Sequence, residues 1–250
     1  AKQALREKGK AAAAKRSGRS TSEVIALVVA NADSTKVAGV VVECETDFVA
    51  RNDDFKALVK SLADAILGEV DVAAGESREL SGGSSVGGKT LDEHATDAVA
   101  KIRENIRIPR AVARTAGQGA KFAVYNHTNT GKLASYVEYT GDNAGAAFKL
   151  AIQVVAFPPN YLRKEDVPQS VIESELKIET QRAINEGKPA EVAEKVAQGR
   201  VNKEYYQSQV LLEQPYYEDT KKKVSDVARE AGISVVAFRL LGVGAGSGEE

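Results

Sequence analysis

The sequence predicts an α+β fold with two similar α/β core subdomains, each built on an antiparallel sheet, and a helical-hairpin (coiled-coil) insertion in the second. The first observation is a pair of β-branched runs followed by helical patterns, and the second is a later series of strand patterns followed by another helix. The third is a change after residue 168 to charged, helix-favouring sequence. A chain of 250 residues is long enough for two cores of ordinary size.

The first subdomain opens with β-branched residues at 24–30 and 37–44, which are separated by the turn-rich Asn31-Ala32-Asp33-Ser34. This pattern predicts an antiparallel hairpin. Cys44 falls on the apolar face of the second strand. Because no cation or helix N-terminus obviously lowers the pKa of this thiol, we expect a small buried hydrophobe and not a reactive cysteine.

Two helices are predicted next. Asn52 or Asp53 can cap the first helix. Its apolar residues recur at helical spacing, namely Phe55, Leu58, Val59, Leu62 and Ile66. Thr90 and Glu93 have the spacing of a capping box and predict the start of the second helix. Glycine and serine are frequent between the two helices, so we expect residues 75–89 to form a surface loop.

The second subdomain repeats this plan. A strand pattern at residues 108–115 closes the first subdomain, and the strand patterns of the second occupy residues 121–125 and 133–139. Asp142 or Asn143 can cap a following helix, which we expect to end at Ala156 before a pair of prolines. After the insertion, residues 221–231 are predicted to form a last helix and residues 233–241 a final strand.

The insertion is predicted to be an arm of two antiparallel helices. Residues 169–186 and 190–207 are charged and helix-favouring, and Gly187-Lys188-Pro189 divides them. Glycine suits the end of one helix, and proline suits the first turn of the next. At ~1.5 Å per residue each helix would be about 27 Å long, which is too short for a free-standing coiled coil.

These elements define the expected domain plan. Core subdomain N covers residues 21–117, and core subdomain C covers residues 118–243, with the arm at 169–207 inside it. Residues 1–20 are expected to form a basic helix and a linker, and the glycine-rich residues 244–250 a flexible tail.

The composition argues against several classes of protein. The chain has 34 basic and 35 acidic residues and a net charge of −1, so no global field attracts nucleic acid. One cysteine and two histidines, far apart in sequence, do not form a zinc motif. The phosphate-binding loops and nucleophile motifs of common enzymes are also missing from the sequence. We therefore expect no metal, no cofactor and no enzymatic chemistry.

The same composition bears on the compartment. The longest uncharged apolar run is well short of the ~18 residues that a membrane span needs, so we expect no transmembrane segment. A single cysteine cannot form an internal disulfide, which favours a reducing compartment.

One motif carries a resemblance to a known family. The stretch Glu43-Cys44-Glu45-Thr46-Asp47-Phe48-Val49-Ala50-Arg51-Asn52 resembles the signature of the elongation factor Ts family. Further matches follow in family order over essentially the whole chain, namely Leu5-Arg6-Glu7-Lys8-Gly9, Lys101-Ile102-Arg103-Glu104-Asn105-Ile106, Glu186-Gly187-Lys188-Pro189, Gly199-Arg200-Val201-Asn202-Lys203 and Leu211-Leu212-Glu213-Gln214-Pro215. The chain departs from the family at Arg103, where members usually have glycine.

The resemblance implies a guanine-nucleotide exchange factor for elongation factor Tu that acts by binding, without covalent chemistry or direct contact with GDP. It assigns the exchange wedge to Thr46, Asp47, Phe48 and Val49. Phe48 would enter a cleft of the partner's nucleotide domain while Asp47 acts near the bound Mg²⁺ and phosphates. By resemblance, Ile102 and His127 are further contacts with the nucleotide domain.

The resemblance also concerns the rest of the chain. It implies that residues 1–20 hold the last helix of an N-terminal helical (UBA-like) domain, and that the arm reaches the partner's nucleotide domain. Residues 213–215 and 235–240 would help to form the surface for a second domain of the partner. Both core halves together with the arm resemble the bacterial type, which implies the cytoplasm, with an organellar matrix or stroma as the alternative.

Other interpretations of the same residues remain open at this stage. Phe48 could instead cover the local core, with Asp47 capping the next turn. A ribosome-associated RNA-binding or scaffold protein could use the basic residues of 2–19 together with Lys221-Lys222-Lys223. A cysteine enzyme would require Cys44 to act with a histidine.

Overall fold

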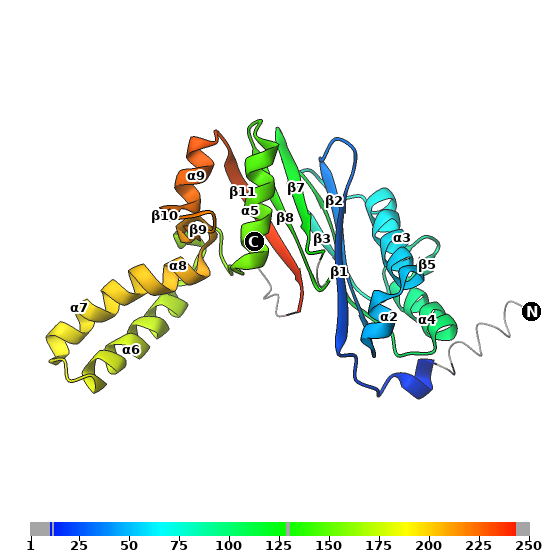
Figure 1. Cartoon of the computed structure of the whole chain (residues 1–250), viewed down its shortest axis with the longest axis horizontal. Helices are drawn as coiled ribbons and strands as arrows, with labels where there is room; N and C mark the ends of the chain where they lie inside the picture. The colour runs from blue at the N-terminus through cyan, green and yellow to red at the C-terminus, as the bar shows by residue number, and fades with distance from the viewer. Residues whose placement is uncertain (1–10, 12, 129–130, 244–250) are drawn as a thin grey trace, which may run out of the picture.

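The computed structural model describes residues 11, 13–128 and 131–243. Within them the chain forms antiparallel sheets with packed helices, so the predicted α+β class is confirmed (Figure 1). In the predicted basic helix, residues 11 and 13–16 are helical. Residues 1–10 and 12 lie outside the described residues. The predicted tail at 244–250 lies outside them as well.

The first sheet has four antiparallel strands in the order β1-β2-β6-β3. They are β1 (Glu23–Ala30), β2 (Lys36–Cys44), β6 (Arg107–Thr115) and β3 (Ser77–Leu80). The predicted hairpin is confirmed, since β1 pairs with β2 from Glu23 opposite Cys44 to Ala30 opposite Val37.

The prediction that residues 75–89 form a surface loop is wrong. Strand β3 pairs with β6, and β4 (Ser85–Val86) pairs with β5 (Lys89–Thr90). Leu80 is the one buried residue of β3, so this short edge strand lacks the apolar alternation by which a strand is recognised in sequence. Its pairing with β6, a contact distant in sequence, makes it a strand.

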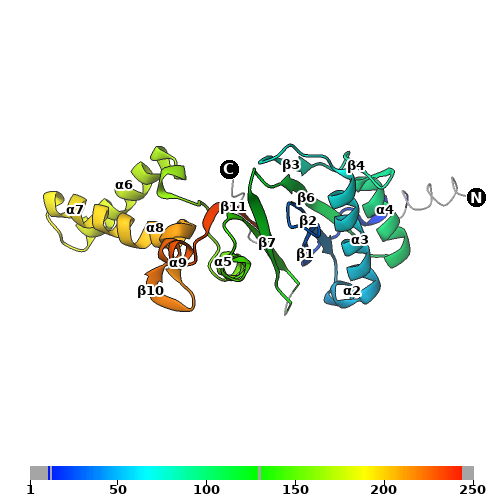
Figure 2. The same cartoon turned by 90° about the horizontal axis from the view of Figure 1, so that it is seen from above.

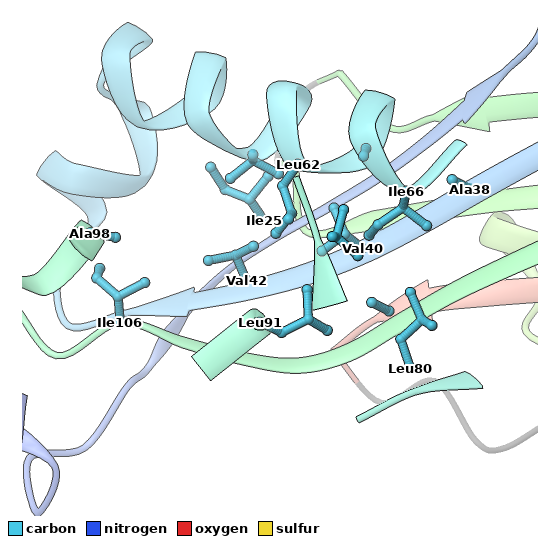
Figure 3. Close-up of a cluster of buried hydrophobic side chains, with 14 of the residues drawn as sticks. Ile25, Ala38, Val40, Val42, Leu62, Ile66, Leu80, Leu91, Ala98 and Ile106 are labelled. Carbon is cyan, nitrogen blue, oxygen red and sulfur yellow. The ribbon is translucent and has the colours of Figure 1, made fainter. Parts of the chain in front are cut away.

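Helices α3 (Asp53–Glu69) and α4 (Leu91–Ile102) cover one face of this sheet (Figure 1). As predicted, Asn52 caps α3 and Thr90 forms a capping box with Glu93 at the start of α4. Figure 3 shows the resulting core, in which Leu62 and Ile66 of α3 lie against strand residues such as Val40.

The second sheet has three antiparallel strands in the order β11-β8-β7. They are β7 (Ala120–Asn126), β8 (Leu133–Thr140) and β11 (Ser234–Gly242). Helix α5 (Ala144–Ala156) packs on this sheet through Ala147, Leu150 and Val154, and Asn143 caps it as predicted.

The predicted helix at 221–231 is partly wrong. Residues Asp219–Lys223 form strand β10, which pairs with β9 (Pro215–Tyr216), and helix α9 (Val224–Glu230) begins only after it. The backbone N–H of Lys223 donates to Asp226 at 3.4 Å, so the helix starts where Asp226 can satisfy this donor.

The two sheets pack face to face, with α3 and α4 on one outer side and α5 on the other (Figure 2). The interface is a separate core cluster that includes Val28 and Val112 of the first sheet and Phe122 and Tyr136 of the second. A Cβ at Gly39 would overlap the side chain of Leu241, so glycine lets β2 approach β11 closely. The strand patterns alone did not predict this sheet-on-sheet packing.

An ion pair joins the two sheets. Arg114 Nε of β6 donates to Glu138 Oε2 of β8 at 2.7 Å, and both side chains are buried, at 8% and 0% exposure. The other oxygen of Glu138 accepts the backbone N–H of Gly117 at 2.8 Å. Glu138 therefore satisfies donors from the first sheet and from the link between the sheets.

The arm consists of α6 (Gln169–Asn185) and α7 (Ala190–Arg200), which project away from the sheets (Figures 1 and 2). The helices approach closely through buried alanines, namely Ala183, Ala193 and Ala197. Arg200 of α7 contacts Glu179 of α6 at 3.3 Å and Glu186, the residue after α6, at 2.6 Å. Gly187 has a φ of 86°, which suits its place after the end of α6.

Two buried glutamines fix the base of the arm. Gln153 of α5 donates to Gln214 Oε1 at 2.9 Å, and Gln214 donates to the carbonyl oxygen of Phe157 at 2.8 Å. Gln214 is 2% exposed. The expectation that Gln214 helps to form a partner-binding surface is therefore wrong, and its amide instead holds the chain after the arm to α5.

No helix in the described part of the chain combines the length and the apolar character that a bilayer crossing requires.

We predict that Glu138→Ala lowers the free energy of unfolding by about 3 to 5 kcal/mol, because the substitution removes the buried carboxylate that faces Arg114 and the Gly117 N–H. Urea denaturation followed by circular dichroism measures this loss. Glu230→Ala is the control, since it breaks an exposed ion pair with Lys222 and should leave the urea midpoint nearly unchanged. Equal midpoints for the two variants would contradict the role of Glu138.

Candidate functional site

Phe48 stands out as a large apolar side chain in solvent. It lies on the short helix α2 (Asp47–Arg51), is 83% exposed, and has no buried neighbour within its helix. Phe55, seven residues later, is 1% exposed in the core below. The alternative that Phe48 covers the local core is therefore wrong.

The sequence around Phe48 defines the two ends of α2. Thr46 is the N-cap, and its hydroxyl accepts the backbone N–H of Val49 at 3.4 Å. Asp47 lies in the first turn and contacts Arg51 at 3.3 Å, with 46% of the Asp47 side chain exposed. The alternative that Asp47 is the cap is wrong, and its carboxylate is accessible beside Phe48.

Asn52 turns the chain from α2 into α3. It ends α2 with an extended backbone, and its side-chain oxygen accepts the N–H groups of Asp54 at 2.8 Å and Phe55 at 3.2 Å. The same residue thus ends one helix and caps the next. This change of direction lets α2 project Phe48 outwards while α3 packs on the sheet.

The loop before α2 is held from across the subdomain by Glu104, which follows the end of α4. One oxygen of Glu104 accepts the backbone N–H groups of Glu45 and Thr46, both at 3.1 Å. The other accepts the hydroxyl of Thr46 at 2.6 Å. A single carboxylate therefore satisfies three donors of the segment that leads into α2.

A second set of contacts runs in the opposite direction. Glu45 Oε1 accepts the backbone N–H of Asn105 at 2.6 Å, and Glu45 Oε2 lies 3.5 Å from Arg19. The side chain of Asn105, which is 4% exposed, donates to the carbonyl oxygen of Arg19 at 2.7 Å. The segment preceding β1, the end of β2 and the end of α4 are joined in one hydrogen-bonded cluster.

Ile102 lies close to this region. It lines a groove together with Val49 of α2 and with Phe55 and Leu58 of α3. Ile102 is half-buried, so it both packs on the core and offers surface to the groove. The structure thus brings Val49 and Ile102 to one groove although 53 residues separate them in sequence.

His127 belongs to the other sheet. It follows β7, and its Nδ1 lies 2.9 Å from the hydroxyl of Tyr125, whose ring packs edge-on against Phe148 of α5. Phe148 is 44% exposed. His127 is therefore part of an aromatic surface on the second sheet, and not part of the groove beside α2.

Cys44 is completely buried at the end of β2, as its position on the apolar face predicts. Burial, reinforced by the negative charge of Glu104, raises the pKa of this thiol to about 12. A thiol that stays protonated at neutral pH is a poor nucleophile, so the structure does not favour a cysteine enzyme. The described residues also contain no group of three or more His, Cys, Asp or Glu arranged to hold a metal ion.

Comparison with known proteins assigns the family. The sequence profile described as Elongation factor TS matches residues 45–245, which include both α2 and the arm. The chain is 38% identical to Elongation factor Ts of a Hydrogenobaculum species, over 95% of this chain and 85% of that protein. The chain belongs to the elongation factor Ts family. It is also 36% identical to Elongation factor Ts of Aquifex aeolicus, over 94% and 83% of the two chains, and 39% identical to that of Saccharopolyspora erythraea, over 96% and 84%.

Membership of the elongation factor Ts family confirms the resemblance carried by the sequence motifs, and it fixes the function in outline. The chain is a nucleotide exchange factor for elongation factor Tu in translation elongation. Such a factor acts by binding, so the site to look for is a protein-binding surface.

Arg103, at a position where the resemblance leads us to expect glycine, has a backbone conformation that favours glycine. It ends α4 with a φ of 66°, in the left-handed region that glycine adopts without strain. Its side chain is exposed. The departure from the family therefore costs backbone strain but leaves the hydrogen bonds of Glu104 and Asn105 in place.

Sequence reasoning missed the contacts of Glu45, Glu104 and Asn105. These residues stand in the two motifs that carry the family resemblance, but the strings do not indicate that they bond to each other. The signal that was available is chemical: Glu104 and Asn105 are polar residues directly before the buried Ile106, where hydrogen-bond partners are required.

We predict that Arg103→Gly raises the free energy of unfolding by about 1 kcal/mol, because the left-handed conformation costs an L-residue about 1 to 2 kcal/mol more than glycine. Thermal denaturation measures the gain. Arg103→Ala is the matched control, since it removes the same side chain but keeps the strained Cβ. If both variants are stabilised equally, the side chain and not the backbone is the cause.

Proposed function

We propose that Phe48 is the wedge of this exchange factor, and that Thr46, Asp47 and Val49 support it in the partner interface. The observation that supports the proposal is a large apolar side chain, 83% exposed, on a short helix that is capped and fastened at its N-terminus. An exposed aromatic residue gains most from burial against a partner and loses little conformational entropy. Asp47 beside it supplies a carboxylate that can disturb the Mg²⁺ and phosphate site of elongation factor Tu.

The proposed mechanism is thermodynamic linkage between binding of the factor and binding of GDP to Tu. If the factor binds nucleotide-free elongation factor Tu more tightly than the GDP-bound form, the affinity of Tu for GDP must fall by the same factor. Phe48 creates this difference in affinity if its binding site on Tu opens only when the helices of Tu next to the phosphate site move. No direct contact with GDP, no cofactor and no covalent step is needed.

Further contacts are proposed for Ile102 and His127 with the nucleotide domain of Tu. Ile102 shares the groove with Val49, next to the wedge. His127 would bind separately, from the aromatic surface of the second sheet. The last strand, β11, is proposed to face a second domain of Tu, since Val236 is 40% exposed on it.

The arm is proposed to reach the nucleotide domain of Tu, since it projects beyond the sheets and exposes large apolar side chains. These are Ile178 at 55%, Ile184 at 40% and Val192 at 44%. Exposed apolar residues on a protruding hairpin suit a partner surface.

The division at residues 21–117 and 118–243 is proposed as the domain plan, with 169–207 as the inserted arm and residues 1–20 as the end of an N-terminal helical domain. It is supported by one main sheet in each half, whose outer faces carry separate core clusters. The bacterial relatives favour the cytoplasm of a bacterium as the place of action.

The ribosome-associated RNA-binding alternative receives little support from the described residues. Lys222 pairs with Glu230 at 2.6 Å and Lys223 with Glu213 at 2.8 Å, so two of the three consecutive lysines face carboxylates. A phosphate backbone would have to compete with both.

We predict that Phe48→Ala slows the release of fluorescent GDP from elongation factor Tu by about thirtyfold, because truncating a buried interface anchor commonly costs about 2 kcal/mol of binding. Its melting temperature should stay near that of the parent chain, because Phe48 is exposed. Phe157→Ala is the control, since it removes another exposed phenylalanine, at 53%, which follows α5 on the second sheet. Normal exchange by Phe48→Ala would reject the wedge.

We also predict that replacing residues 181–197 by a short glycine and serine linker lowers exchange without abolishing it. The buried side chains of this segment are alanines that pack between α6 and α7, so both sheets should still unfold cooperatively. GDP release and calorimetry measure the two effects. Undiminished exchange would show that the outer arm has no role, and loss of cooperative unfolding would show that it belongs to the core.

A further inference from the structure

We infer that Glu104 is a positioning residue for nucleotide exchange: it holds α2 at the orientation in which Phe48 can enter the partner. The inference rests on the proposed role of Phe48. It begins from the fact that Phe48 is 83% exposed and belongs to none of the core clusters. The direction in which Phe48 points must therefore come from the backbone that carries it.

That backbone is fixed by Glu104 through a short chain of hydrogen bonds. Glu104 Oε1 accepts the hydroxyl of Thr46 at 2.6 Å, and the same hydroxyl accepts the N–H of Val49 within α2. Glu104 Oε2 accepts the N–H groups of Glu45 and Thr46 at 3.1 Å each. One carboxylate therefore holds three donors between the end of β2 and the start of α2.

Residue type matters here. A carboxylate accepts at both oxygens, so it can satisfy two backbone donors on one side and a hydroxyl on the other. Glutamine has the same shape but one accepting oxygen, and its NH₂ group would face the Thr46 hydroxyl or the two N–H groups. Alanine would leave all three donors to water and free the loop to move.

Glu104 is itself held in place. It lies between Arg103, which ends α4, and Asn105, whose backbone N–H donates to Glu45 at 2.6 Å. The contacts therefore cross in both directions between the end of α4 and the end of β2, two elements of the same core. Glu104 transmits the rigidity of that core to α2, and the resulting orientation is available before the partner arrives.

The first test needs no partner. Amide hydrogen exchange of Glu104→Ala should show at least about tenfold faster exchange at Glu45, Thr46 and Val49, while the amides in the middle of α3 stay protected. The matched control is Glu93→Ala, which removes a carboxylate at the other end of α4 that accepts the N–H of Thr90 at 3.0 Å. Unchanged protection at Glu45 and Thr46 in Glu104→Ala overturns the inference, whatever the fate of the wedge.

The second test is a double-mutant cycle on GDP release from elongation factor Tu. Glu104→Ala should slow release by about tenfold, and Glu104→Gln by less, since misplacing a positioned group costs rate without removing it. Combined with Phe48→Ala, Glu104→Ala should add almost nothing, because it acts through a side chain that is already gone. Glu93→Ala should leave the rate unchanged.

The outcomes separate the two proposals. Independent, additive losses from Glu104→Ala and Phe48→Ala would overturn the positioning role and leave the wedge intact, and so would a rate for Glu104→Ala equal to that of Glu93→Ala. If Phe48→Ala exchanges normally, the wedge fails, and with it the claim that Glu104 serves exchange. The hydrogen-exchange result would then still report whether Glu104 orders the loop.

Discussion

The packing of the two sheets against each other is the constraint on which the rest of the structure depends. The interface excludes water between Val28 and Val112 on one side and Phe122 and Tyr136 on the other, and Gly39 allows the strands to approach. Inside it, Glu138 satisfies Arg114, so the charged groups are buried together and not singly. Because each sheet has a helical layer on its outer face, this one interface sets the positions of α2 on one side and of the arm on the other.

The proposed functional residues lie at the edges of this frame. Phe48 lies on a short helix, Ile102 at a helix end and His127 after a strand, where side chains can leave the core. The core then supplies what these positions lack, namely a fixed orientation. Polar residues carry out this task twice: the half-buried Glu104 and the buried Asn105 fasten the segment before α2, and the buried Gln153 and Gln214 fasten the base of the arm.

Much of the fold could be predicted because its determinants are local. The hairpin of β1 and β2, the caps at Asn52 and Thr90 and the arm all follow from period, turn residues and capping chemistry. Two of the failures share one physical cause, which is that the deciding contact is distant in sequence. Strand β3 exists because β6 offers an edge, and Glu104 matters because its partners lie 58 and 59 residues earlier. The residue type alone did not indicate that Phe48 is exposed, since an aromatic residue after a strand is usually packed. Only the motif around Phe48 indicated its exposure.

The proposed role of Phe48 as a wedge requires a rigid loop to carry it. An exchange factor moves groups in its partner, and by the same force the partner pushes back on the factor. A wedge on a loose loop would yield first, and the binding energy would reorder the factor instead of displacing Mg²⁺ and GDP. Under the proposed mechanism, the differential affinity for nucleotide-free elongation factor Tu is limited by the stiffness of the segment that carries Phe48. Carboxylate and amide contacts join this segment to the ends of β2 and α4, so exchange by the proposed wedge would depend on hydrogen bonds that need not touch the partner.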